Sequence, residues 1–194
     1  MLYNLWMIEV SLCRICASSK LDNILELGMN PISGHFPKLN EEVQSLPLNL
    51  ARCSSCGLIQ LYNILPISEL YSETYGYESH LNSSMQKHLF DKALELQQIF
   101  QSRVSNKNGV FLDIASNDGT LLSGYLQGSS KDTLIGIDPL IPNFNDCYPE
   151  DTVKIQDFFS ADKYFEHTKV KASLVTSLSV LYDLESPTLS LIHI

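Results

Sequence analysis

The chain has 194 residues, with 22 acidic and 13 basic side chains, a formal net charge of -9 and 44% hydrophobic residues. This is a globular composition, and the length suits one complete domain, or a small module joined to part of a second. Because nucleic-acid binding depends on clustered Lys and Arg, the acidic balance argues against a nucleic-acid partner. No apolar stretch approaches the roughly 20 residues that span a bilayer, and the first ten residues include Glu9 but no basic residue. We therefore expect no membrane partner, no signal peptide and a cytoplasmic location.

Four of the five cysteines form two C-x-x-C pairs, Cys13 with Cys16 and Cys53 with Cys56. In a reducing compartment disulfides are rare, and paired thiols more often hold a metal. Four thiolates complete the tetrahedral shell of a structural zinc ion and leave no position for water or substrate. The spacing predicts structural, non-catalytic Zn²⁺, with a redox pair or unliganded core cysteines as the alternatives. Gly57 follows Cys56 where a positive φ is often needed.

Residues 1–70 are expected to form a small, loop-rich zinc-binding module. Pro31, Gly34, Pro37 and Pro47 interrupt the segment between the two cysteine pairs, and such residues mark turns and loops. A module of this size has little core of its own, and a bound metal commonly compensates for that.

Residues 71–107 are expected to form a helical connector. Within it, residues 82–103 predict an amphipathic helix, and Ser83 with Gln86 suggests a capping box at its start. The side chains of the predicted buried stripe are Met85, Leu89, Ala93, Leu96 and Phe100.

Residues 108–194 alternate apolar strands with helix-length segments, which indicates parallel βαβ units in a doubly wound α/β sheet. A helix is expected to begin near Thr120. The predicted strands are 110–114, 133–138, 152–156 and 172–178.

Polar residues follow the first two of these strands, where a doubly wound sheet binds its ligands. A phosphate-binding loop would carry several glycines, but the run DIASNDG has one glycine and two carboxylates. Carboxylates repel a pyrophosphate and attract a sulfonium or ammonium cation, and an acidic residue after the second strand can accept hydrogen bonds from ribose. These features point to S-adenosylmethionine, with an ordinary polar turn as the alternative. The residues concerned are Asp113, Ser116, Asn117, Asp118, Gly119 and Asp138.

The chain resembles the S-adenosylmethionine-dependent sugar C-methyltransferases, which join a zinc-binding N-terminal module to a Rossmann-like class I methyltransferase domain. The resemblance is carried by CRIC, LELGMNPISGHF, PLNLARCSSCGLIQL, YGYESHLNSSMQKH, FLDIASNDGTLL and GIDP. It implies that the four paired cysteines bind zinc. It also implies a set of cofactor contacts: Asp113, Ala115, Ser116 and Asn117 at the methionine end, Asp138 at the ribose, Asp157 and Phe158 at the adenine, and Tyr75, Tyr77 and Ser79 near cofactor and sugar. For the tyrosines, ordinary packing is the alternative.

The sequence departs from the family pattern at two places. Members usually have Gly where this chain has Ala115, and the best-known members carry a histidine involved in proton abstraction where this chain has Tyr182 and Asp183. Methyl transfer to carbon requires a base that removes a C–H proton beside a ketone. Tyr182 and Asp183 are therefore candidates for that base, with ordinary strand-end residues as the alternative.

The resemblance implies methylation of a carbon of a nucleotide-linked keto-sugar. Because family members have seven strands and about twice this length, we expect the chain to be an N-terminal fragment with an incomplete Rossmann-like domain and no activity by itself. The alternative is a zinc-ribbon module that contacts a partner protein or nucleic acid. Residues 1–60 contain only four basic residues, Arg14, Lys20, Lys38 and Arg52, which gives nucleic-acid binding little support.

Overall fold

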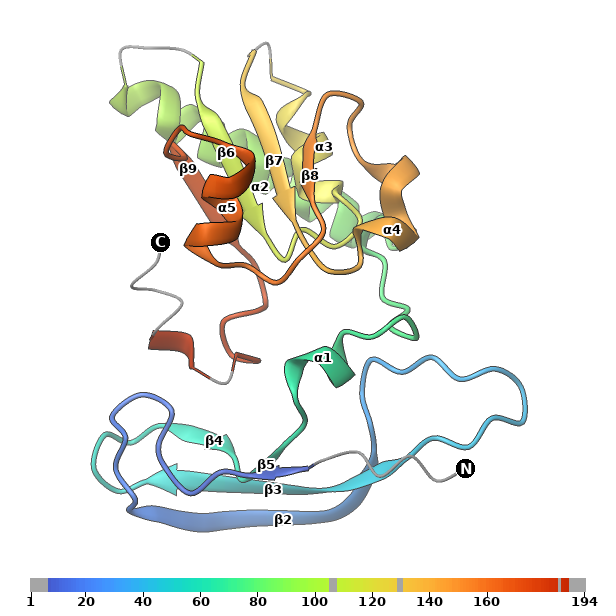
Figure 1. The fold of residues 1–194 in the computed structure, drawn as a ribbon, viewed down its shortest axis with the longest axis vertical. Coiled ribbons are helices and arrows are strands. Elements are labelled where there is room, and N and C mark those ends of the chain that lie inside the picture. Colours follow the sequence, from blue (N-terminus) through green and yellow to red (C-terminus); the bar gives the residue numbers. More distant parts are fainter. Residues whose placement is uncertain (1–6, 105–107, 129–130, 185, 189–194) are drawn as a thin grey trace. The chain divides into compact units, whose positions relative to one another are not determined.

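The computed structural model describes residues 7–104, 108–128, 131–184 and 186–188 (Figure 1). The chain divides into two compact units. The first unit comprises Met1–Gly76 together with Tyr182–Ile192, and the second comprises Tyr77–Leu181 together with His193–Ile194. Each unit is described by itself below.

The first unit is built on a three-stranded antiparallel sheet in the order β2-β3-β4. Its strands are β2 (Leu21–Pro31), β3 (Ser45–Cys53) and β4 (Ile59–Leu61). A second pairing joins β1 (Ile8–Glu9) to β5 (Asn63–Ile64), and the short helix α1 (Ile67–Leu70) follows. The expectation of a loop-rich module is wrong for residues 21–31 and 45–53, which are strands.

The edge position of β2 explains why its Gly and Pro do not prevent strand formation. Its pairing with β3 shifts register twice, and Gly28 lies in the second shift with a φ of 72°. A glycine accepts such a left-handed conformation at little cost. Pro31 ends the strand, where a missing N–H is tolerated. Every residue of β2 is exposed or half-buried, so the strand adds little apolar burial to the unit.

The second unit contains a four-stranded parallel sheet in the order β8-β7-β6-β9. Its strands are β6 (Val110–Ile114), β7 (Thr133–Ile137), β8 (Val153–Ile155) and β9 (Leu174–Ser177), so each lies within a range predicted from the sequence. Figure 1 shows α5 (Ala161–His167) in front of this sheet, and α2 (Ser83–Arg103) and α3 (Thr120–Tyr125) behind it. Shorter segments are the 3₁₀ helices η1 (Ser79–Leu81) and η2 (Asn145–Cys147) and the helix α4 (Ile141–Phe144).

Apolar side chains cover both faces of this parallel sheet, as expected for strands that helices flank. Behind the sheet, the ring of Phe111 stacks edge-on against Phe100 and Tyr125, with ring centroids 5.1 and 4.9 Å apart. Gly124 allows α3 to approach α2, since a Cβ there would lie 2.8 Å from the Cβ of Ala93. The cluster that includes Tyr164 of α5 comprises Leu112, Ile114, Ile135, Ile137, Ile155 and Tyr164.

The long helix α2 begins as predicted but with a different cap. The side chain of Asn82 accepts hydrogen bonds from the amides of Ser84 and Met85, at 3.0 and 3.1 Å. The predicted capping box on Ser83 and Gln86 is therefore wrong, because the Asn82 side chain already satisfies the free amides of the first turn. Of the predicted stripe, Leu89, Ala93 and Phe100 are buried.

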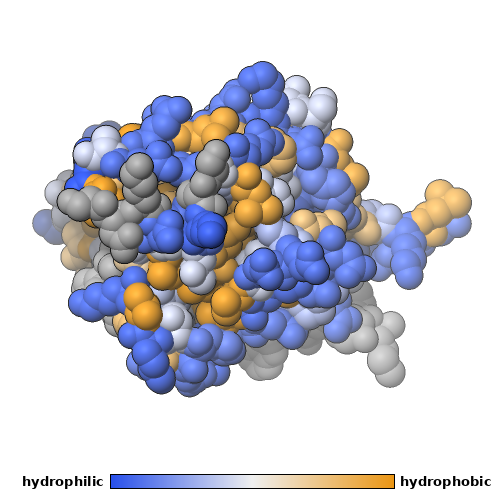
Figure 2. All heavy atoms as spheres, turned by 90° about the horizontal axis from the view of Figure 1, so that it is seen from above, coloured by the Kyte–Doolittle hydropathy of each residue, from blue (hydrophilic) through white to orange (hydrophobic). Residues whose placement is uncertain are grey.

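Among the described residues, no helix combines the length and the apolar character that crossing a bilayer requires. Figure 2 shows one face of the molecule, on which hydrophobic residues form a strip between hydrophilic ones.

Candidate functional site: a four-cysteine centre and the carboxyl edge of the parallel sheet

The two C-x-x-C pairs meet in the first unit. The sulfur atoms of all four cysteines lie within 4.8 Å of one another, and the sulfurs of Cys13 and Cys56, like those of Cys16 and Cys53, are 3.6 Å apart. Sulfurs at the ~2.3 Å bond length of a tetrahedral zinc site lie about 3.8 Å from one another. None of the four is in a disulfide. The donor set and its spacing therefore fit Zn²⁺.

The two cysteine loops have the same backbone design. In each, the amide of the residue after the second cysteine donates to the carbonyl of the first: Ala17 to Cys13 at 2.9 Å and Gly57 to Cys53 at 2.8 Å. Both donors have positive φ, 55° at Ala17 and 81° at Gly57. The predicted positive φ at Gly57 is confirmed, but sequence reasoning missed Ala17 because alanine carries no sign of a left-handed backbone.

Backbone amides favour thiolate at the first cysteine of each loop. Hydrogen bonds from the amides of Cys56 and Ser55 lower the pKa of Cys53 to about 6. Burial raises the pKa of Cys13, but amides of Cys16 and Ile15 lower it further, so the net direction is downward. Thiolate is the form that binds metal. The backbone amides of the two loops therefore favour the metal-binding form of Cys13 and Cys53.

Gln60 fastens the first cysteine loop to the sheet. Its side-chain carbonyl accepts from the amide of Arg14 at 3.0 Å, and its amide group donates to the carbonyl of Leu12 at 3.2 Å. Gln60 lies on β4 and is 3% exposed. Its role was not visible from the sequence because the contacts span 46 and 48 residues.

The second polar centre lies in the second unit, at the carboxyl ends of the parallel strands. The turn 115–119 follows β6, Asp138 follows β7, and Asp157 and Phe158 follow β8. Because parallel strands present their carboxyl ends at the same edge, the structure brings these predicted residues to one edge of the sheet. Asp157 forms an ion pair with Lys163 of α5 at 3.3 Å, and both Asp157 and Phe158 are half-buried.

The turn 115–119 has an unusual backbone conformation. Ala115, Asn117 and Gly119 have φ values of 57°, 50° and 74°, which is the left-handed region. Asparagine and glycine adopt it readily, whereas alanine does so at a cost. A Cβ at Gly119 would also lie 2.8 Å from the ring of Tyr148, so both conformation and space require glycine there.

Asp138 joins the turn after β6 to the turn after β7. Its carboxylate accepts hydrogen bonds from the amide of Asn117 at 2.9 Å and from the amide of Leu140 at 2.7 Å. Asp138 is buried, and burial raises its pKa even though these two amides lower it. Each carboxylate oxygen retains a second lone pair for a ligand.

Asp113 is a buried acid within β6. It is 4% exposed and accepts a hydrogen bond from the Thr176 hydroxyl at 2.7 Å. Burial, together with the negative charge of Asp138, raises the pKa of Asp113 to about 7. Acidic side chains whose pKa is strongly shifted by burial and by a neighbouring charge are concentrated at functional sites.

The side chains of Asn117 and Asp118 hold a segment that precedes α2. Asn117 donates to the carbonyl of Tyr77 at 3.0 Å and accepts from the amide of Ser79 at 3.4 Å. Asp118 is 1% exposed and accepts four hydrogen bonds, from the amide and side chain of His80 and of Thr120. The structure thus brings Tyr77 and Ser79 to the turn and directs the Asp118 carboxylate into the protein.

Tyr148 supports the turn and was missed by sequence reasoning. Its hydroxyl donates to the Asn117 carbonyl at 2.6 Å, so the Ser116 hydroxyl, 2.8 Å away, donates to Tyr148. Tyr148 follows η2, and no local pattern connects it to a turn some 30 residues earlier.

Three predicted residues belong to the first unit. The Tyr75 ring lies 5.0 Å from the ring of Tyr71. Asp183 accepts a hydrogen bond from the Tyr71 hydroxyl at 2.7 Å, and Tyr182 is 66% exposed.

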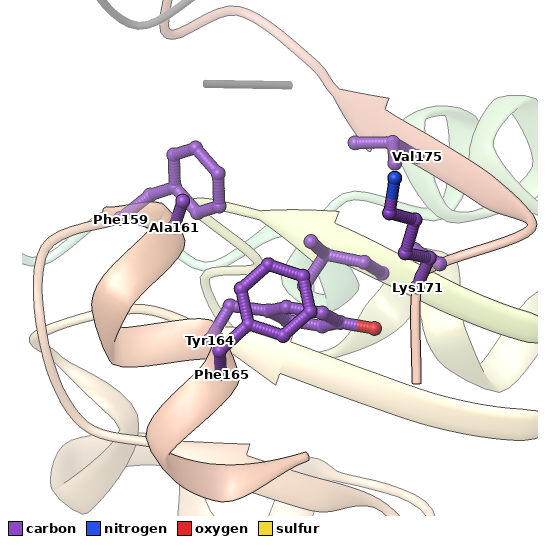
Figure 3. A pocket seen from close by; sticks show the side chains of 8 residues that line it. Phe159, Ala161, Tyr164, Phe165, Lys171 and Val175 are labelled. Atoms are coloured by element: carbon purple, nitrogen blue, oxygen red, sulfur yellow. The ribbon is translucent and has the colours of Figure 1, made fainter. Parts of the chain in front are cut away.

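A hollow of about 230 Å³ lies beside α5 over β6 and β9 (Figure 3). Its lining is mostly apolar and continues the core cluster that contains Tyr164. It shares no residue with the turn 115–119, and we do not assign it to the polar centre. The lining residues are Leu112, Phe159, Ala161, Tyr164, Phe165, Lys171, Ala172 and Val175.

Comparison with known protein families gives one match. The Methyltransf_13 family model, described as a zinc-binding domain, matches residues 13–71, a range that contains all four clustered cysteines. No curated protein matches the chain. Residues 13–71 therefore form a methyltransferase-associated zinc-binding domain whose four cysteines are arranged to hold a metal ion.

Proposed function

We propose that the protein is an S-adenosylmethionine-dependent methyltransferase that acts on a carbon of a nucleotide-linked keto-sugar. The observation that carries the proposal is the pairing of two features in one chain. The first unit holds a four-cysteine centre within a methyltransferase-associated domain. The second has a parallel sheet with carboxylates at its carboxyl edge.

The topology of the second unit supports a Rossmann-like fold. In chain order its strands lie 3-2-1-4 across the sheet, since β8, β7, β6 and β9 are neighbours in that order. The order of a doubly wound sheet reverses beside its first strand, and ligands bind outside the carboxyl ends at that point. The turn 115–119 follows this first strand, β6.

The charge at this edge suits the cofactor we propose. Asp113 and Asp138 are buried, and a buried carboxylate without a cation is costly. A sulfonium or ammonium group would offset that cost, and ribose hydroxyls can donate to the second lone pairs of Asp138. Asp157 and Phe158, after the neighbouring strand β8, are proposed to contact the adenine, and Tyr75, Tyr77 and Ser79 to lie near cofactor and sugar.

The metal is proposed to be structural. When bound, zinc would cross-link the loops of Cys13, Cys16, Cys53 and Cys56. With four sulfur ligands, the site offers no open position for a substrate. Chemistry at the substrate carbon would fall to the protein. Tyr182 and Asp183 are candidates for the base by position, because they stand where the family carries its histidine.

Calorimetric titration with S-adenosylhomocysteine tests the cofactor assignment. We expect binding by the parent chain and a loss of about 10- to 150-fold in Asp138→Asn, which corresponds to the 1.5–3 kcal/mol of a hydrogen bond to a charged group. Asp151→Asn, at an exposed position, is the matched control and should bind like the parent. A folded, zinc-loaded chain that does not bind the ligand would refute the proposal.

A partner-binding module is the second candidate function, and the surface of β2 favours it. The strand exposes Ile24, Leu25, Leu27 and Met29, each between 45% and 65%, and an exposed apolar edge strand is a common site of pairing with another chain. This second candidate function predicts that the protein does not bind S-adenosylhomocysteine. It also predicts that Leu27→Asp abolishes capture of a partner protein.

A further inference from the structure

His80 is held by a buried carboxylate beside the turn 115–119. Its Nδ1 lies 2.9 Å from Oδ2 of Asp118, and its backbone amide donates to the same oxygen at 2.8 Å. The imidazole is 36% exposed, whereas the Asp118 side chain is 1% exposed. The ring is therefore fixed on one side by the protein and accessible on the other.

The hydrogen bonds determine which nitrogen carries the proton. Burial raises the pKa of Asp118, but hydrogen bonds from Thr120 and His80 lower it further, so the net direction is downward. An ionised carboxylate only accepts hydrogen bonds, so Nδ1 of His80 must donate. In the neutral ring, Nε2 then carries the lone pair, which is the arrangement of a general base.

A second carboxylate faces that lone pair. Oε2 of Glu78 lies 3.6 Å from Nε2 of His80, longer than an ordinary hydrogen bond. After Nε2 takes a proton, the ring lies between two negative charges, Asp118 and Glu78. Each ring nitrogen then faces a carboxylate oxygen.

His80 is also connected to the proposed cofactor site. The neighbouring residue Ser79 donates from its amide to the Asn117 side chain, and the Asn117 amide donates to Asp138. Asp118, which orients His80, belongs to the same turn.

We propose that His80, oriented by Asp118, rather than Tyr182 or Asp183, is the base that removes the substrate proton, an assignment that rests on the proposed methyl transfer. Nε2 takes the proton from the carbon beside the ketone, and the C–H electron pair forms an enolate. S-adenosylmethionine, when bound, would supply the methyl group to the enolate carbon and would retain the C–S electron pair on sulfur as S-adenosylhomocysteine. The imidazolium returns its proton to water.

Exchange of the substrate proton with solvent measures this step without methyl transfer. The full chain, loaded with zinc and S-adenosylhomocysteine, is incubated in D₂O with 4-keto-hexoses linked to uridine or thymidine diphosphate, and deuterium uptake beside the ketone is followed by NMR. Proton exchange needs the base and the bound ketone but not the complete methyl transfer that we do not expect from this chain by itself. We therefore expect exchange in the parent and at least a 100-fold loss in His80→Gln, the lower bound for a general base. His88→Gln, on the exposed side of α2, is the matched control and should exchange like the parent.

The outcomes separate this assignment from the proposed function. If His80→Gln exchanges at the parent rate, or if a parent chain that binds S-adenosylhomocysteine exchanges no substrate, His80 is not the base and the cofactor assignment stands. If the parent chain binds no S-adenosylhomocysteine, the proposed function itself fails. Nitrogen-15 NMR of the His80 ring adds a test that needs no substrate: a proton on Nε2 rather than Nδ1 in the neutral ring would overturn the assignment.

Discussion

At the scale of single residues, two residues near the carboxyl edge of the parallel sheet are in conformations or environments that cost folding free energy. Ala115 adopts a left-handed backbone, and Asp113 keeps a carboxyl group away from water. Natural proteins retain such features mainly where function needs them. Each can be removed by one substitution, so the cost of each can be measured.

Replacing Ala115 with glycine should stabilise the protein or leave it unchanged. The left-handed conformation costs a non-glycine residue about 1–2 kcal/mol, and glycine's greater freedom in the unfolded chain returns about 0.5–1 kcal/mol of that. We expect urea unfolding to show a gain of up to about 1.5 kcal/mol. Ala161→Gly, at the first position of α5, should instead lose stability, and a comparable loss at position 115 would contradict the strain argument.

Replacing Asp113 with asparagine should remove a pH-dependent loss of stability. The pKa of Asp113 is raised to about 7 from 3.8, so its favourable contribution is complete below pH 3.8 and is lost as pH rises towards 7. Asparagine does not titrate and can still accept from Thr176. At pH 8 the variant should be the more stable, by at most about 4 kcal/mol for a shift of about three pKa units.

The difference between Asp113→Asn and the parent is measured by chemical denaturation between pH 4 and pH 8. Asp151→Asn, at an exposed position, is the control and should follow the parent throughout. A constant difference for the position-113 variant over this range would show that Asp113 is ionised in the folded protein.

At the scale of elements, the sequence predicted those strands and turns whose residue pattern is contained within a short segment of chain. The run Val110–Ile114 was predicted as a strand because apolar residues buried on both faces of a parallel sheet follow one another without alternation. β2 was missed because an exposed edge strand has no such pattern. The position of the turn 115–119 was also predictable. The directions of its side chains were not, since Asp118 contacts His80 38 residues away and Ser116 contacts Tyr148 32 residues away.

The cap of α2 provides a local test. Asn82→Ala removes the oxygen that accepts from the amides of Ser84 and Met85, and loss of an N-cap costs about 1 kcal/mol. Thermal or urea unfolding should show that loss. Ser83→Ala, at the first helical residue, should change stability by only a few tenths of a kcal/mol. A larger effect at Ser83 than at Asn82 would restore the capping box suggested by the sequence.

At the scale of the whole molecule, the two units differ in what stabilises them. The second unit has a packed core on both faces of its sheet. Among the described residues of the first unit, few apolar ones outside its cysteines are buried: Val10, Ala51 and Leu65. A metal ion can supply the folding free energy that so small a core lacks.

Removing zinc should therefore unfold the first unit before the second. We expect one zinc per chain, and we expect a chelator or Cys53→Ser to abolish hydrogen-exchange protection in β2, β3 and β4 while β6 and β7 stay protected. Elemental analysis and hydrogen-exchange mass spectrometry measure both effects. Cys147→Ser, at an exposed cysteine outside the cluster, is the control and should keep its zinc. Equal protection with and without the metal would refute a structural role.

The first unit is assembled from two separate stretches of chain, Met1–Gly76 and Tyr182–Ile192, so the described backbone passes between the units twice. A single proteolytic cut between residues 76 and 77 would leave residues 1–76 without a covalent link to the rest of the chain, so only non-covalent contacts would hold the two stretches of the first unit together. The later stretch also supplies hydrogen-bond acceptors, the Asp183 carboxylate for Tyr71 and the Leu184 carbonyl for Arg14. If residues 1–76 were expressed alone, Tyr71 and Arg14 would lose these hydrogen-bond acceptors. A minimal version of the first unit must therefore include residues 182–184.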